Sequence, residues 1–212
     1  MAQSVEHLRQ PRRNDSGFTL TELLAVCAVV GTMAAITIPF TTQMTAGYRV
    51  KGSAEAINKQ VSLAKIRASA RFTRARVYAD LNAGTSRVQI WEKKTPLAEG
   101  KWVTEGGVQT LARGVTFGFA SHTQPPPNTQ AAIKQSDVCK DDKDADIANT
   151  ACITFNSRGM PVTNVVPPNG TVVGNNALYI TNGNIVYGVT VTATPYVNFW
   201  WSPGKNNQWV RQ

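Results

Sequence analysis

A single uninterrupted apolar run near the N-terminus constrains this chain more than any other feature. Residues 18–40 read FTLTELLAVCAVVGTMAAITIPF and include one charged residue, Glu22. As an α-helix with a rise of about 1.5 Å per residue, the run would extend about 35 Å, enough to cross a hydrocarbon core of about 30 Å. Arg9, Arg12 and Arg13 precede it, and basic residues before a span favour a cytoplasmic N-terminus. We therefore expect a single-pass membrane helix.

Two simpler interpretations of this run fit its details less well. A secretory signal has an apolar region of roughly 7–15 residues followed by a small-residue cleavage site. Here the run is longer, and the expected break, between Gly17 and Phe18, precedes it. A plain membrane anchor does not explain Glu22, because a carboxylate inside a span is costly and therefore marks a functional position.

The residues around this break resemble a known family. The string GFTLTELL at 17–24 resembles the class III signal of type IV pilins and type II secretion pseudopilins. The resemblance implies that a prepilin peptidase cuts after Gly17 on the cytoplasmic side and that the new N-terminal residue, Phe18, is methylated. The family's glutamate is Glu22 here, and the proline of its membrane helix is Pro39. Thr21 departs from the pattern, because an aliphatic residue is more usual there.

The chemistry of these residues agrees with the role that the resemblance implies. After cleavage, the amine of Phe18 is a buried cation, and Glu22 lies one helical turn further along. An unpaired carboxylate in lipid is unfavourable, so pairing with a neighbouring subunit's amine would drive assembly and set its register. Pro39 lacks a backbone N–H and is expected to kink or locally melt the helix.

Beyond Pro39 the helical pattern continues as a narrow apolar stripe on an otherwise polar helix. Its members recur at steps of three and four residues: Val50, Ala54, Ile57, Val61, Ala64, Ala68, Phe72 and Ala75. From about residue 77, short segments that alternate apolar and polar residues predict strands, with turns at Asn156–Gly159 and at Asn182-Gly183.

This order of features predicts an α+β protein in which a long N-terminal helix packs on an antiparallel β-sheet head, as in the pilin fold. We expect four parts. They are a cleaved cytoplasmic leader (1–17), a transmembrane helix (18–45), an amphipathic helix of the head (46–78) and a β-rich globular head (79–212).

Later segments narrow the resemblance. An Ala- and Arg-rich helix, the strand VYADL, a Trp-bearing segment and ITFNSRGMPV follow one another over residues 50–165. This order resembles the GspH/FimT group of minor pseudopilins. Some members of that group are DNA-binding minor pilins of natural transformation and carry a basic Gly-Arg-x-Arg turn near the C-terminus. Here the tail reads WWSPGKNNQWVRQ, which has Gly204-Lys205 without the arginine pattern.

The chain is also basic, with 22 Lys and Arg against 13 Asp and Glu and a formal net charge of +9. Such a balance suits nucleic acid, anionic lipid or an acidic partner, and equally a solvated basic surface. On a helical wheel three arginines share one flank, and cations among tryptophans can hold single strands, although the tryptophans can also fill a sheet core. The candidate DNA-binding residues are Arg67, Arg71, Arg74, Lys205, Trp209 and Arg211.

Cys139 and Cys152 bracket a polar loop. A head outside the cytoplasm lies in an oxidising compartment, so these two cysteines are predicted to form a disulfide. Two thiols and poorly placed histidines do not make a zinc site. Cys27 lies in the apolar run, where we expect it to pack as a small apolar residue.

The same loop is acidic. Asp142, Asp144 and Asp146 superficially match a calcium loop, but Ile147 and Ile153 stand where an EF-hand has Gly and Glu. We expect a solvated acidic loop and no metal or other cofactor. The sequence has no nucleophile motif, phosphate loop or histidine placed as a base, so we do not expect an enzyme.

These observations predict a minor type IV pilin or type II secretion pseudopilin, a structural subunit at or near a filament tip. Its expected partners are other pilins or pseudopilins, the prepilin peptidase and the inner membrane. The head would lie in the periplasm, and later in an extracellular pilus or a periplasmic pseudopilus. A pilus-tip DNA-binding minor pilin for natural transformation, with DNA as a partner, and a major pilin are the alternatives.

Overall fold

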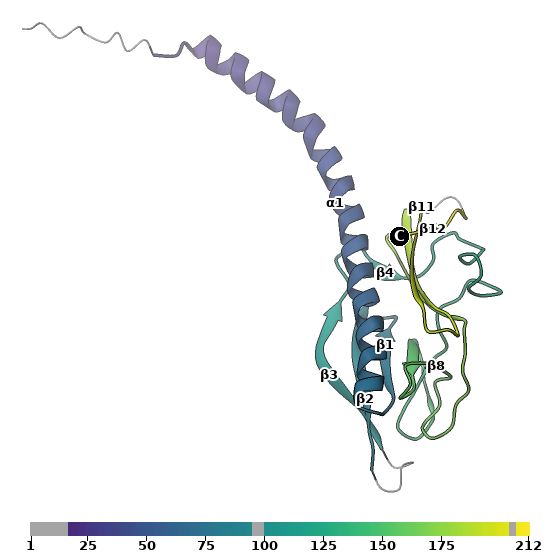
Figure 1. Ribbon diagram of the computed structural model, residues 1–212. Helices are drawn as coiled ribbons and strands as arrows, with labels where there is room; N and C mark the ends of the chain where they lie inside the picture. The colour runs from purple at the N-terminus through teal and green to yellow at the C-terminus, as the bar shows by residue number, and fades with distance from the viewer. Residues whose placement is uncertain (1–16, 95–99, 204–206) are drawn as a thin grey trace, which may run out of the picture. The chain divides into compact units, whose positions relative to one another are not determined.

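A computed structural model describes residues 17–94, 100–203 and 207–212, apart from the side chains of residues 38–43. The chain forms two compact units, Met1–Gln43 and Met44–Gln212. One helix, α1 (Leu20–Ala70), begins in the first unit and ends in the second (Figure 1). The predicted leader, apart from Gly17, lies outside the described residues.

The first unit consists of the apolar beginning of α1. Residues Leu20–Thr37 have a mean hydropathy of 1.9, and every one of them is exposed. In the described part of the chain this is the one helix long and apolar enough to cross a membrane. The helical assignment continues through residue 39, so the chain does not melt at Pro39. A kink at this proline stays a prediction.

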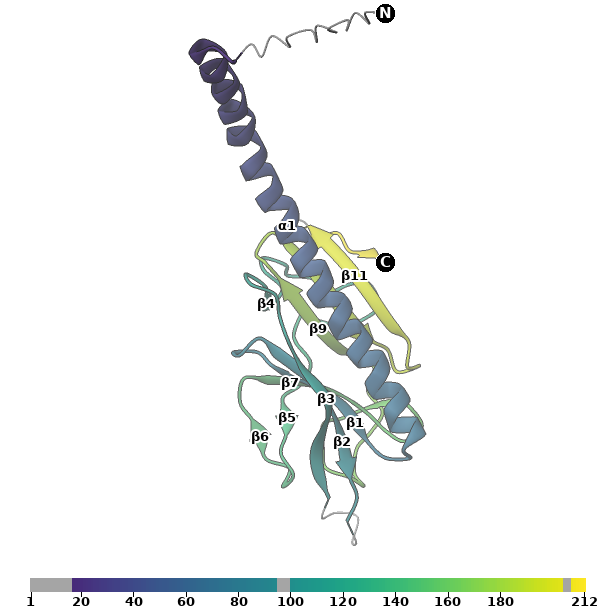
Figure 2. The ribbon, with the colours of Figure 1, turned by 90° about the vertical axis from the view of Figure 1, so that its left-hand side faces the viewer.

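In the second unit, α1 from Met44 onward lies over two five-stranded antiparallel sheets, where the sequence suggested one (Figure 2). The first sheet has the order β3-β2-β1-β7-β8, and the second has the order β12-β11-β10-β9-β4. The first comprises β3 (Lys101–Thr110), β2 (Thr85–Glu92), β1 (Ala75–Asp80), β7 (Thr150–Phe155) and β8 (Pro161–Val162). The second comprises β12 (Val210–Arg211), β11 (Val197–Pro203), β10 (Ile185–Val191), β9 (Asn176–Thr181) and β4 (Thr116–Phe117). A small hairpin, β5 (Cys139–Lys140) with β6 (Asp146–Ile147), completes the head.

The predicted apolar stripe of α1 forms the centre of the core. Its fully buried members are Val50, Ala54, Ile57, Val61, Ala64 and Ala68. They pack with alternate residues of both sheets, including Val77 and Ile153 of the first and Leu178 and Ile180 of the second. Successive strand residues point to opposite faces, so one face of each sheet meets the helix. Three alanines in the stripe let the helix backbone approach the sheets closely.

The helix ends earlier than the sequence pattern predicts. It stops at Ala70 instead of continuing to residue 78, and Ala75 already belongs to β1. The chain leaves the helix through Phe72, whose φ of 49° is left-handed. The Thr73 N–H donates to the Ala68 carbonyl at 3.1 Å, and the Phe72 N–H donates to the Ser69 carbonyl at 3.3 Å. This is a Schellman cap with Phe72 where glycine usually stands, and its side chain is 75% exposed instead of buried.

Both predicted turns are confirmed. Asn182 and Gly183, with Gly183 at φ 88°, connect the paired strands β9 and β10. Between β7 and β8, the Gly159 N–H donates to the Asn156 carbonyl at 2.8 Å, and Gly159 has φ 72°. A glycine at each turn supplies the left-handed conformation without a Cβ penalty.

Candidate functional site

The predicted processing site lies in a short non-helical segment before α1. Gly17 and Phe18 are both exposed, and Phe18 is 87% accessible. A bond in such a segment can enter a peptidase in an extended conformation.

Glu22 closes the first turn of α1 by a capping box. The Thr19 N–H and the Thr19 hydroxyl both donate to Glu22 Oε2, at 3.0 and 2.9 Å, and the Glu22 N–H donates back to Thr19 Oγ1 at 3.3 Å. The pattern Thr-x-x-Glu at residues 19–22 is the sequence signature of this cap, which could have been found from the sequence and was missed. Among the described residues Glu22 Oε1 has no partner, so one carboxylate oxygen is available to a group from outside the chain.

The predicted disulfide is confirmed. Cys139 and Cys152 are joined with an S–S distance of 2.03 Å and a Cα–Cα distance of 5.0 Å. The bond ties the β5–β6 hairpin to β7, and both cysteines pack with Tyr78 and Ile147 in a small buried cluster. Cys27 is exposed on the apolar helix and is a free thiol. Its expected apolar packing has no counterpart within the described part of the chain.

An arginine that the sequence analysis did not single out fastens this hairpin to the first sheet. The Arg76 guanidinium lies 3.9 Å from the centroid of the Trp102 ring. Its Nε donates to Gln89 Oε1 at 2.8 Å, and its Nη1 donates to the Lys140 carbonyl at 2.6 Å. Burial lowers the pKa of Arg76 to about 9. Arg76 alternates with the core residues Ala75 and Val77, and this alternation could have placed it on the outer face of the sheet.

Two of the predicted DNA-binding arginines share one carboxylate. Arg67 Nε lies 3.3 Å from Glu105 Oε1, and Arg71 Nη2 donates to the same oxygen at 3.0 Å. These residues join the end of α1 to β3. Both arginines are still partly exposed. Arg67 and Arg71 therefore form a basic surface ridge whose charge Glu105 partly neutralises.

Arg74 does not share that flank, and this prediction is wrong. It follows the end of α1, is 8% exposed, and donates hydrogen bonds to the backbone carbonyls of Val165, Pro168 and Asn169. Burial lowers the pKa of Arg74. The helical wheel failed here because the chain turns at Phe72 before residue 74 is reached. Arg74 holds the 163–170 loop in place.

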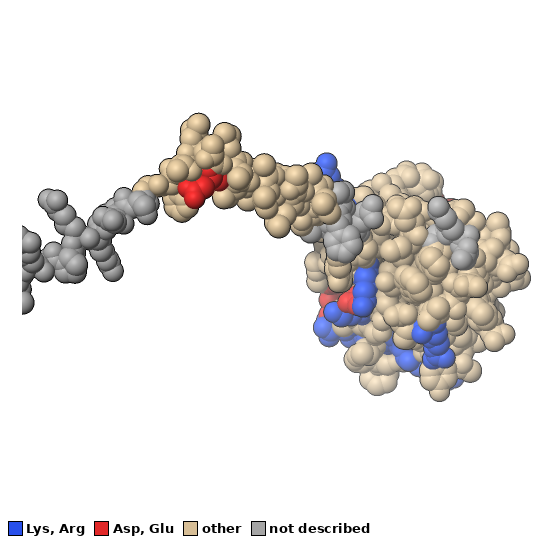
Figure 3. Space-filling view, turned by 90° about the horizontal axis from the view of Figure 1, so that it is seen from above, with Lys and Arg blue, Asp and Glu red and all other residues tan. Residues whose placement is uncertain are grey.

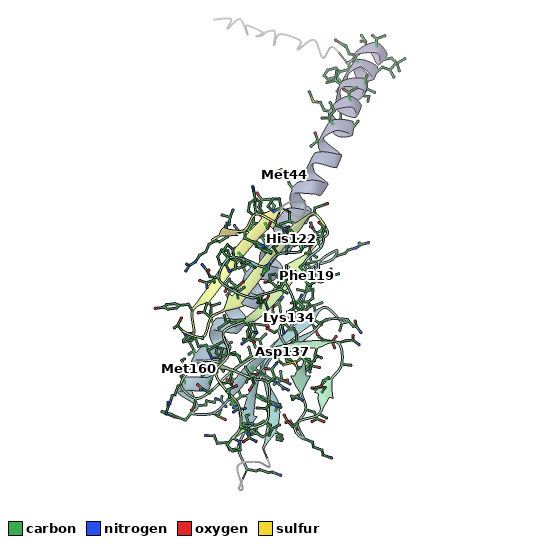
Figure 4. The ribbon with its side chains drawn as sticks, turned by 90° about the vertical axis from the view of Figure 1, so that its right-hand side faces the viewer. Met44, Phe119, His122, Lys134, Asp137 and Met160 are labelled. Atoms are coloured by element: carbon green, nitrogen blue, oxygen red, sulfur yellow. A yellow bond between two sulfur atoms is a disulfide. The ribbon has the colours of Figure 1, made fainter. Side chains whose placement is uncertain are left out.

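Trp209 is a packing residue instead of an open stacking platform. Its Nε1 donates to the Gln124 carbonyl at 3.0 Å. Its ring centroid lies 4.9 Å from that of His122 and 5.7 Å from that of Tyr179. Figure 4 shows Phe119 and His122 beside the second sheet. They belong to the segment that Trp209 contacts through His122 and the Gln124 carbonyl.

The remaining members of the predicted DNA-binding set are Arg211 and Lys205. Arg211 is exposed in β12 and pairs with Trp200. Lys205 lies outside the described residues. The five members that are described have different surroundings: two arginines at the end of α1 share Glu105, one arginine is buried against loop carbonyls, the tryptophan is packed, and Arg211 is exposed in an edge strand.

The acidic loop is held by its own hydrogen bonds. The Asp141 carboxylate accepts the N–H groups of Ala145 and Lys143, which lower the pKa of Asp141. Asp142 accepts the Trp102 N–H at 2.8 Å, and Asp146 pairs with Lys140 at 2.8 Å. Within the described ranges no group of three His, Cys, Asp or Glu side chains is arranged to hold a metal ion.

One comparison with known proteins agrees with the N-terminal chemistry. The model of the prokaryotic N-terminal methylation motif matches residues 12–38. A search of curated proteins gives no match. Among solved structures, the chain is similar to the minor pseudopilin EpsH from the Type 2 Secretion System of Vibrio cholerae. The two share 12% identity over 74% of this chain and 99% of that chain, with a TM-score of 0.43.

Three features of the chain support one class of protein. They are the methylation motif, the exposed apolar helix that begins just after Phe18, and the antiparallel β-rich head. Together they support the type IV pilin and pseudopilin superfamily and an α+β pilin-like fold. The motif and the apolar helix also support anchoring in a membrane.

Proposed function

We propose that this chain is a minor type IV pilin or type II secretion pseudopilin, a structural subunit incorporated at or near the tip of a filament. One observation carries the proposal: the helix that bears the methylation motif is exposed at every position from Leu20 to Thr37. An apolar helix without cover in its own unit needs lipid or other apolar helices around it. Membrane insertion followed by packing against neighbouring subunits supplies both.

The N-terminus is cytoplasmic in this proposal, and the head lies in the periplasm. The prepilin peptidase removes residues 1–17, and Phe18 is then methylated. The Cys139–Cys152 disulfide supports an oxidising location for the head. Figure 3 supports the anchor: the visible surface of the apolar span is uncharged apart from one acidic group, whereas Lys and Arg gather in several places on the visible face of the head.

Glu22 fixes the position of each subunit relative to its neighbour in the assembled filament. In the isolated chain its Oε2 is used by Thr19. The free Oε1 then accepts a hydrogen bond from the Phe18 amine of a neighbouring subunit. A charge pair in lipid is favourable only when both partners are present, so a subunit that is out of register leaves a costly unpaired group.

The proposal is tested by mass spectrometry of the native protein. The expected N-terminus is a methylated Phe18. A Gly17→Leu variant is the control, and it should retain the whole leader. An intact leader in the wild-type protein, or a cut beyond Pro39, would contradict the pilin interpretation.

A second test separates the charge of Glu22 from its role in the cap. Glu22→Ala should still insert into the membrane, because the span becomes more apolar, but its incorporation into filaments should fall sharply. Glu22→Gln retains the capping acceptor and loses the charge. We expect it to assemble as poorly as Glu22→Ala in a filament pull-down. If Glu22→Gln entered filaments as well as the wild-type protein does, the role of Glu22 would be helix capping and not charge pairing.

A further inference from the structure

A cavity of about 240 Å³ lies in the head where the chain leaves α1. Its lining comes from the segment between α1 and β1, the end of β2, the turn between β7 and β8, and the 163–170 loop. Two of the described residues that line it, Arg74 and Lys93, are basic, and none of them is acidic. The cavity is therefore positively charged, and its electrostatic complement is an anion.

Arg74 brings an almost completely buried charge to this cavity. It is 8% exposed, and its guanidinium donates only to neutral groups, the carbonyls of Val165, Pro168 and Asn169. Burial lowers the pKa of Arg74, and Asp144 opposes this from a distance without forming an ion pair. A buried charge with this environment gains stability from an anion in direct contact with it.

Lys93 brings the second charge and still has donors to offer. Its side chain is exposed, and its Nζ donates to the Phe72 carbonyl. An ammonium carries three N–H donors, and no acidic group in the described part of the chain pairs with Lys93. A carboxylate has two oxygens and forms stronger hydrogen bonds with cations than a neutral acceptor does. It therefore suits a cavity that is lined by both cations.

The conformation of Phe72 is an independent sign of a binding site. Its φ of 49° is left-handed, and its ring is 75% exposed although it lines the cavity. A residue with a Cβ is unfavourable in this conformation, and the exposed ring gains little from packing within the head. Strained backbone positions of this kind cluster at sites that hold ligands. With Val162 and Pro167 the ring gives the cavity an apolar part, so the ligand should carry an apolar group as well as its charge.

Hydrogen bonds hold the two sides of the cavity together before any ligand binds. The Trp91 N–H donates to the Arg74 carbonyl at 2.9 Å, and the Thr73 hydroxyl donates to the Trp91 carbonyl at 2.8 Å. A preformed site loses little conformational freedom on binding. Its volume lies below the range of about 300–1,000 Å³ that is usual for drug-sized ligands. A molecule about as large as one amino-acid residue fits it better.

We propose that this cavity binds a small carboxylate with an apolar substituent, the carboxylate lying against Arg74 and Lys93 and the apolar group against Phe72 and Val162. Two sources have this chemistry: a free molecule such as an N-acyl amino acid, and the free C-terminal residue of a peptide chain. Inorganic phosphate has the charge but lacks the apolar part. This ligand site goes beyond the structural role proposed above.

The test is a titration of the full-length protein in a neutral detergent, with binding measured by saturation-transfer NMR of the ligand. The probe is N-acetyl-leucine, and its matched control is N-acetyl-leucinamide, which has nearly the same shape without the charge. We expect a dissociation constant of about 1 mM or below for the carboxylate. The amide should bind at least about tenfold more weakly, because it loses the charge-assisted hydrogen bonds.

A leucine-terminated decapeptide, with a free or an amidated C-terminus, distinguishes the two sources. Both outcomes below support the proposal. Binding of the free-ended peptide at least as tightly as N-acetyl-leucine would assign the cavity to chain ends. Binding of N-acetyl-leucine without the peptide would assign it to a free molecule.

Substitutions then test whether the ligand occupies this cavity. Lys93→Gln changes an exposed side chain and should weaken the binding of N-acetyl-leucine about tenfold. Arg113→Gln removes the same charge from an exposed site outside the cavity and should leave binding unchanged. Phe72→Ala removes the ring and retains a Cβ, and it should weaken binding about tenfold through the lost apolar contact.

Arg74→Lys retains a charge and loses the fork of the guanidinium, so it should weaken binding as well. Arg74 also holds the 163–170 loop, and if this variant does not fold, the Lys93 and Phe72 variants still decide the question. Equal binding of N-acetyl-leucine and its amide, equally tight binding of inorganic phosphate, or unchanged binding in either Lys93→Gln or Phe72→Ala would overturn the proposal. Binding by the purified chain is independent of leader cleavage and of entry into filaments, so this site and the proposed function stand or fall separately.

Discussion

The two ends of α1 are parts of one helix with opposite surroundings. From Leu20 to Thr37 every residue is exposed; Leu23 and Leu24, for example, are 59% and 61% accessible. From Val50 to Ala68 six apolar residues are completely buried beneath two sheets. The apolar residues of the first end are no less hydrophobic than those of the second, so the hydrophobicity of these side chains does not by itself explain the difference.

The pattern of the apolar residues explains it. The first end is apolar all round, and such a helix is stable only when apolar material surrounds it on every side. The second end concentrates its apolar residues at the helical period, and one covered side is then enough. The chain supplies that cover for the second end through its own strands. In the proposed function, lipid and other subunits cover the first end.

A matched pair of isoleucine substitutions tests this difference and should give the largest change in the free energy of unfolding. Ile57→Ala removes a fully buried side chain and should lower the free energy of unfolding of the head by about 2–5 kcal/mol. Ile36→Ala makes the same chemical change at a site that is 75% exposed and should leave that free energy unchanged. Denaturant unfolding of the detergent-solubilised full chain, followed by tryptophan fluorescence, measures both. Equal effects would show that the two ends are not independent.

The disulfide provides the next test, because it braces the head and has no counterpart in the described part of the first unit. Cys139→Ala/Cys152→Ala opens a loop whose closure contributes about 3 kcal/mol in the chain-entropy model. The midpoint of denaturant unfolding of the head should fall accordingly. Cys27→Ala changes a free thiol in the exposed helix and is the control that should leave the midpoint in place. An unchanged midpoint in the double variant would mean that the other contacts of the hairpin, those of Arg76 and Tyr78 among them, hold it without the disulfide.

The smallest effect concerns the end of the covered part of α1. Phe72 adopts a left-handed conformation with its ring exposed, so Phe72→Gly should stabilise the head by about 1 kcal/mol. Phe72→Ala retains the conformational cost of a Cβ and should give no such gain. Thermal unfolding of the two variants compares them directly. A loss of stability in Phe72→Gly would show that the aromatic ring contributes packing that outweighs the backbone strain.

Much of the structure of the first unit could be predicted from the sequence, because the patterns that specify it are local. The length of the apolar run, the glycine before Phe18 and the spacing to Glu22 are properties of consecutive residues, and the methylation motif found at 12–38 agrees with them. The buried stripe of α1 was predictable for the same reason, since the helical period is itself a local property. The capping box of Thr19 and Glu22 is also a local sequence pattern. It was not predicted because only the charge of Glu22 was considered.

The positions of the arginines and tryptophans were decided by the tertiary structure. Arg67 and Arg74 look alike on a helical wheel, yet one lies on a surface ridge with Glu105 and the other is buried against loop carbonyls. The difference arises at Phe72, where the chain leaves the helix to start β1. Trp209 likewise packs on a segment about 85 residues earlier in the chain. A polar or aromatic side chain takes its partners from whatever the fold brings near it, and those partners are distant in sequence, so short-range patterns cannot specify them.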